Sequence, residues 1–182
     1  MRKTEITSST PTPQAGFGLY VYVLPESEVG NDMLRALEAF HQCLSAPGNA
    51  EAREALALLV LPVRSGEHTI DTSLAHALVR NVLGDSEIDK KEVYLIAVNQ
   101  PLSAGVSALA NGTESVVIRL GRVAPQYVGV WLNRMQSEIE AGRIDSPEEF
   151  DLKIQSVLVI VAEAGKLFGI VSPAQAEAYQ CR

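Results

Sequence analysis

The chain has 182 residues, of which 47% are apolar and 20% charged, and its formal net charge is -7. This length and composition suffice for a packed core without a metal or disulfide staple, which excludes wholesale disorder, a collagen-like repeat and a disulfide-rich mini-scaffold. The 15 basic residues are scattered and outnumbered by 22 acidic ones, so nothing resembles the basic stripe that nucleic-acid binding requires.

Residues 1–15 are rich in Thr, Ser and Pro. We expect them to form a flexible polar tail in front of a single globular domain, residues 16–182. Met1, Arg2 and Lys3 begin like a signal peptide, but the polar run 4–10 stands where an apolar stretch is required. The most apolar window, 157–171, is too short and too charged to span a bilayer, so we expect no membrane insertion. The sequence leaves the compartment unknown; the cytoplasm is the default expectation, with export or tethering if a leader has been removed.

The first half of the domain alternates strand and helix patterns. Uncharged β-branched and aromatic runs predict strands buried on both faces, whereas apolar residues at a spacing of 3.6 predict helices. A helix cap at Asp71 or Thr69 and the stop at Gly84 bound the second main helix. In chain order, the predicted elements are a strand 19–24, a helix 32–45, a short helix 50–56, a strand 58–61, a helix from about 71 to 83 and a strand 93–98.

The second half begins with a hairpin signal, Asn111–Gly112, in front of a predicted strand 116–120. Residues 103–110 read equally as its partner strand or as a short helix. The C-terminal third is predicted to be all helical. Pro125 opens one helix, Ser146 caps a second that is apolar nearly all round beyond residue 157, and Ser172 caps a short last one. The apolar stripe of the first of these helices comprises Val128, Trp131, Leu132, Met135 and Ile139.

This order of elements predicts an α/β fold. We expect a single sandwich in which a small mixed, mostly parallel sheet of about four to five strands is covered by helices. An α+β arrangement is the alternative.

The densest polar cluster, residues 64–73, follows a predicted strand and opens a helix. Ligands of open α/β sheets tend to bind at such junctions. Arg64 could pair with a carboxylate or phosphate, His68 could act as an acid or base, and Asp71 adds a carboxylate. The competing interpretation is structural: Asp71 and Thr69 cap the helix, and the rest is a solvated loop.

A second polar loop, residues 99–105, follows the next buried strand. If the strands are parallel, the two loops lie together at one edge of the sheet, and Asn99 and Ser103 could bind a ligand there. Ser103 as a nucleophile would need His68 as its base. The competing interpretation is a turn built on Pro101 and Gly105.

Motifs for cofactors and metals are missing from the sequence. No phosphate loop, zinc-protease motif or nucleophile elbow occurs, and Gly16 and Gly18 precede a strand where a dinucleotide fingerprint would follow one. His68, Asp71 and His76 lack a third ligand at helical spacing, so no metal site and no cofactor are predicted.

Three functional hypotheses follow. The first is a domain that acts by binding a protein partner or a second copy of itself. The second is a small-molecule or hydrolytic site formed by loops 64–73 and 99–105, with Arg64, His68, Asp71, Asn99 and Ser103. The third is an exported domain with Cys43 and Cys181 joined by a disulfide; otherwise Cys43 is a buried thiol.

Overall fold

The computed structural model describes residues 1–44, 56–67, 69–103, 113–120, 123–142 and 144–154. Within them, five strands form one mixed sheet in the order β1-β3-β2-β4-β5. The strands are β1 (Arg2–Ile6), β2 (Leu19–Pro25), β3 (Ala57–Pro62), β4 (Val93–Val98) and β5 (Ser115–Arg119). The helices are α1 (Asn31–Leu44), α2 (Thr72–Leu83), the short 3-10 helix η1 (Asp85–Glu87), α3 (Pro125–Gly142) and a helix over 147–154.

The sheet divides into a parallel half and an antiparallel half. β3 pairs in parallel with both β1 and β2, whereas β4 pairs antiparallel with β2 and with β5. The α/β fold predicted from the sequence is confirmed. Two of the four strand pairings are parallel, because the chain reverses direction when it enters β4.

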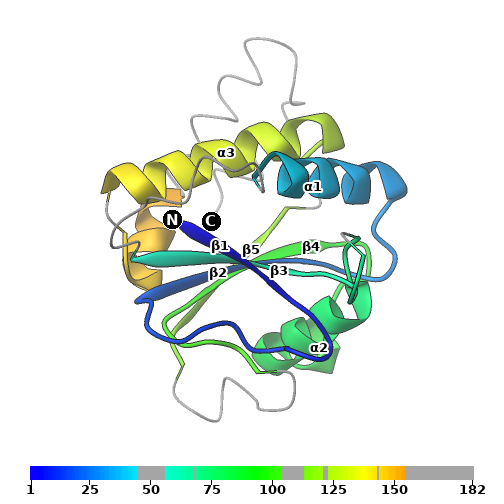
Figure 1. Ribbon diagram of the computed structural model, residues 1–182, viewed down its shortest axis with the longest axis horizontal. Coiled ribbons are helices and arrows are strands. Elements are labelled where there is room, and N and C mark those ends of the chain that lie inside the picture. Colours follow the sequence, from blue (N-terminus) through cyan, green and yellow to red (C-terminus); the bar gives the residue numbers. More distant parts are fainter. Residues whose placement is uncertain (45–55, 68, 104–112, 121–122, 143, 155–182) are drawn as a thin grey trace.

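Helices cover both faces of the sheet. Figure 1 shows α1 and α3 above one face and α2 below the other. Because side chains alternate along a strand, each central strand divides its residues between the two helix layers. In β2, Leu19, Val21 and Val23 pack toward α1 and α3, while Tyr20, Tyr22 and Leu24 pack toward α2.

The central strands are buried along their whole length. Every residue of β2, β3 and β4 is buried, which confirms the strands expected from the uncharged apolar runs. The predicted stripe of α3 is also confirmed, since all five of its residues are buried. Gly18 stands at the start of β2, where a Cβ atom would lie 2.5 Å from the backbone oxygen of Asp145. Glycine is therefore required there to let the two chain segments meet.

The prediction of a flexible tail over residues 1–15 is wrong for its first part. Arg2–Ile6 forms the edge strand β1, and Ile6 is buried beneath the sheet on the α2 side. Thr7 and Thr10 then close a tight turn through reciprocal backbone hydrogen bonds. Local sequence pattern does not predict this strand, because its partner, β3, lies more than fifty residues away in the sequence.

Several predicted features lie outside the described residues. These are the short helix at 50–56, the Asn111–Gly112 hairpin, the apolar helix beyond residue 154, the helix at Ser172 and Cys181. The side chain of Cys43 is also outside them, so the proposed disulfide stays a prediction.

Candidate functional site

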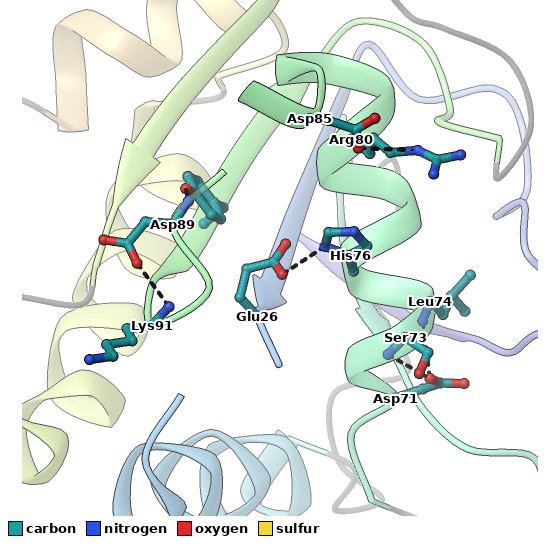
Figure 2. Close-up of polar contacts among 10 residues, drawn as sticks. Glu26, Asp71, Ser73, Leu74, His76, Arg80, Asp85, Asp89 and Lys91 are labelled. Atoms are coloured by element: carbon teal, nitrogen blue, oxygen red, sulfur yellow. Dashed lines mark hydrogen bonds and ion pairs between the residues drawn. The ribbon is translucent and has the colours of Figure 1, made fainter. Parts of the chain in front are cut away.

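The carboxyl ends of the parallel strands β2 and β3 meet at one edge of the sheet and lead into α1 and α2. A polar pair lies there that joins the end of β2 to α2. Glu26 Oε2 is 2.8 Å from Nδ1 of His76. The Glu26 side chain is fully buried, whereas that of His76 is 39% exposed. Figure 2 shows Glu26 reaching from the strand end toward the imidazole on the neighbouring helix.

The position of Glu26 follows from the alternation along β2. Tyr20, Tyr22 and Leu24 face α2, and Glu26 is the next residue of that series. Its backbone N–H still donates to the carbonyl of Glu92, so the chain remains extended past the end of the strand. The carboxylate is thereby placed against α2, where His76 borders the buried stripe of that helix.

This pairing fixes the chemistry of the imidazole. A carboxylate only accepts hydrogen bonds, so Nδ1 of His76 carries the donated proton. Nε2 of the neutral ring then presents a lone pair that can accept a hydrogen bond or a proton. The second oxygen of Glu26, Oε1, is buried and has no hydrogen-bond partner among the described residues. Glu26 is thus a buried carboxylate for which His76 supplies the hydrogen-bond donor.

A cavity of about 500 Å³ lies at the same edge, on the side of α1 and α3. It is lined by the first residues of α1, the start of β4 and the start of α3. Lys91 and Asp32 are its charged residues. Among the described residues, no group of three or more His, Cys, Asp and Glu side chains is arranged to hold a metal ion.

Arg64 and Asp71 follow the end of β3, as the sequence predicts. The chain there forms a closed turn. The backbone N–H of Arg64 donates to the carbonyl of Thr69, and Val63 and Ile70 form an isolated antiparallel β-bridge. Asp71 caps α2: its Oδ1 accepts hydrogen bonds from the backbone N–H groups of Ser73 and Leu74, both at 3.0 Å. The cap is confirmed for Asp71. Arg64 is exposed, and His68 lies outside the described residues.

Asn99 and Ser103 lie at the opposite edge of the sheet. The carbonyl of Ser103 accepts a hydrogen bond from Asn81, near the C-terminal end of α2. Asn99 Nδ2 lies 3.4 Å from Glu114. Leu102 N donates to the Tyr22 hydroxyl at 2.8 Å. Burial raises the pKa of Tyr22 far above 10.0 despite that hydrogen bond, so the phenol stays neutral and keeps this loop in place.

The expectation that the loops after β3 and β4 form one pocket is therefore wrong. β4 is antiparallel to β2 and hence to β3, so the two strands end at opposite edges. Asp71 and Asn81 lie ten helical positions apart, which separates the two anchoring points by about 15 Å along α2. The structure keeps Arg64 and Asp71 together and places Asn99 and Ser103 elsewhere.

Glu26 is not among the site residues predicted from the sequence. The one available signal was its register: a charged residue continues the inward series of an all-apolar strand, and a histidine stands on the helix that covers this face. His76 was considered as a possible metal ligand, and the structure pairs it with Glu26 while its side chain is 39% exposed.

In the part of the chain that the structure describes, no helix has both the length and the apolar content needed to cross a bilayer. Comparisons of the chain with protein-family models, with curated proteins and with solved structures gave no match.

Proposed function

We propose that this domain binds a small molecule at the carboxyl ends of β2 and β3, where His76 makes the polar contact. The observation that carries this proposal is the Glu26–His76 pair: a fully buried carboxylate orients a half-exposed imidazole at 2.8 Å. An imidazole whose second nitrogen is tied to a buried acid is preorganised, because its tautomer and ring plane are set before a ligand arrives.

The second ring nitrogen, Nε2, defines the ligand chemistry. With Nδ1 donating to Glu26, Nε2 of neutral His76 accepts, so the ligand should carry a hydroxyl or amine hydrogen at that point. The location supports the proposal as well, since ligands of open α/β sheets tend to bind outside the carboxyl ends of their strands.

A fragment screen tests this proposal. Protein with ¹³C-labelled histidine would be titrated with hydroxyl- and amine-bearing fragments while the His76 ring signals are followed by NMR. We expect saturable shifts of these signals and a higher melting temperature for the binders. His76→Gln should abolish the thermal shift, whereas Arg80→Ala, one turn further along α2, should retain it. Fragments that stabilise His76→Gln as much as the native chain would overturn the proposal.

Binding of a protein partner or a second copy remains the second candidate function. Two large apolar side chains favour it: Val130 on α3 is 66% exposed, and Leu152 on the helix over 147–154 is 70% exposed. Light scattering across a range of protein concentrations tests self-association through these residues. Leu152→Glu should lower the measured mass if Leu152 contributes, and an unchanged mass would remove this support.

A further inference from the structure

The edge strand β1 is held entirely by parts of the chain that are distant in sequence. Its backbone pairs with β3 over five register positions, from Arg2 opposite Leu58 to Ile6 opposite Pro62. Glu5 Oε1 lies 2.7 Å from His41 Nε2 on α1. None of these contacts requires that the strand and the groove it fills belong to the same molecule.

The groove contacts both charged side chains on one face of β1. Lys3 lies over the Phe40 ring, 5.9 Å from its centroid, and within the electrostatic reach of Glu140 on α3. Glu5 faces His41. The groove therefore presents an acid to the basic residue of β1 and a histidine to its acidic residue, while Ile6 is buried on the other face.

The connection from β1 to β2 is made mainly of local contacts. Thr7 and Thr10 are joined by backbone hydrogen bonds, and the Ser9 hydroxyl lies 3.4 Å from the Ser65 hydroxyl. Residues 8–10 are exposed, and the next buried position is Pro13. The segment 7–12 can therefore straighten without disturbing the core. Six residues span about 20 Å when extended, enough to carry β1 to a neighbouring molecule.

The closed strand also contains one unfavourable feature. The Lys3 ammonium nitrogen is buried and has no hydrogen-bond partner among the described residues. Burial lowers the pKa of Lys3 to about 8, although the charge of Glu140 opposes that effect. Releasing the strand returns this amine to water, which lowers the cost of opening.

We propose that two copies of this chain exchange β1, so that the strand of each copy fills the groove beside β3 of the other. Exchange recreates every contact of the closed strand across the two copies, so its cost is confined to the hinge and to the loss of freedom on association. This inference does not depend on the ligand site at His76.

Mixing two single-cysteine variants tests the exchange, each made in a chain that also carries Cys43→Ser and Cys181→Ser. Thr4 and Val60 are opposite each other on β1 and β3, a separation that a disulfide can bridge. Thr4→Cys chains would be mixed with mass-tagged Val60→Cys chains at high concentration and oxidised with glutathione disulfide. We expect a covalent heterodimer on a non-reducing gel.

The matched control is a Val21→Cys and Leu59→Cys mixture. These residues are opposite each other on β2 and β3, which the exchange leaves within one copy. The Thr4 and Val60 mixture should yield about tenfold more heterodimer than this control, and equal yields would overturn the proposal. If Val60→Cys does not fold, Arg2→Cys with Leu58→Cys, a second opposed pair, decides in the same way.

Three further outcomes bear on the proposal. Lys3→Met should slow heterodimer formation several-fold, because the amine no longer favours opening. A synthetic peptide of residues 1–7 with cysteine at position 4 is offered to Val60→Cys as an alternative occupant. Capture of the peptide without any full-chain heterodimer would overturn exchange between copies. His76→Gln should leave the heterodimer yield unchanged, which separates this proposal from the ligand site.

Discussion

Two ionisable groups are buried on opposite faces of the sheet, and they are accommodated differently. Glu26 stands at the end of the central strand β2 and has a histidine partner at 2.8 Å. Lys3 stands on the edge strand β1, and its buried nitrogen has an aromatic ring beside it but no hydrogen bond among the described residues. A partnered charge is costly to disturb, whereas an unpartnered one costs stability while it remains. Removing the partner of Glu26 and removing the amine of Lys3 should therefore have opposite effects on stability.

The largest effect is expected at the partnered acid. His76→Ala leaves the buried Glu26 carboxylate without its hydrogen-bond donor and should lower the free energy of unfolding by about 3 kcal/mol. Urea denaturation measures this loss. Arg80→Ala serves as the control, since the Arg80–Asp85 contact is exposed and 3.8 Å long and should contribute less than about 0.5 kcal/mol. Equal losses in the two variants would show that Glu26 does not depend on His76.

Lys3→Met tests the cost of burying an amine that has no hydrogen-bond partner among the described residues. Methionine keeps the apolar stem of the side chain and removes the buried amine, so the free energy of unfolding should rise by about 1 kcal/mol. Arg2→Met, at the exposed neighbouring position of the same strand, should change stability by less than about 0.5 kcal/mol. A clear loss of stability in Lys3→Met would mean that the attraction to Glu140 outweighs burial.

A third ionisable side chain, that of Asp71, provides a reference for the stability effects of the His76 and Lys3 substitutions. Asp71 is half exposed and caps α2 through two backbone hydrogen bonds. Asp71→Ala should cost about 1 kcal/mol, and Asp71→Asn, which can still cap, should cost less. Thermal unfolding followed by circular dichroism measures the pair. If both substitutions have the same cost, the charge of Asp71 and not its capping oxygen stabilises the helix.

A pH slope tests the burial of Lys3 in a second way. The pKa of Lys3 is lowered from 10.5 to about 8 in the folded state, chiefly by burial. Between these values the unfolded chain binds more protons than the folded one, so the contribution of Lys3 to stability rises as pH increases from about 8 to 10.5. The difference between the unfolding curves of the native chain and Lys3→Met isolates this contribution. A difference that stays constant over this range would contradict the lowered pKa.

Glu140 titrates at the other end of the pH scale. Burial acts to raise its pKa, but hydrogen bonds from Gln136 and the Met1 amino group, together with the charges of that amino group and Lys3, bring it below 4.5. The stability that it contributes is present above the unfolded pKa and is lost as the pH falls through the folded one.

Local pattern was sufficient for much of the fold. The stripe from Val128 to Ile139 is spaced so that one face of α3 is apolar, and the whole stripe is buried. Asp71 precedes its helix by one residue and caps it. These features depend on near neighbours in the chain, which is why periodicity and capping rules reach them.

The remaining features depend on contacts between distant segments. Arg2–Ile6 has one buried apolar residue and becomes a strand because β3 offers an edge to pair with. The residues of β4 do not specify its direction, since an uncharged apolar run has the same pattern in a parallel and in an antiparallel strand. Glu26 is buried because α2 packs over the end of β2. The pairing of β1, the direction of β4 and the burial of Glu26 all depend on the topology of the sheet. The same topology determines which of the predicted site residues lie together.

The reversal at β4 has a consequence for how this protein can vary. The rims at the two edges of the sheet belong to different ends of α2, so substitutions in 64–67 and in 99–103 touch no common partner among the described contacts. Their effects on stability should add. Each rim is free to acquire or lose a specificity while the other keeps its own, and an engineer could redesign one without retuning the other.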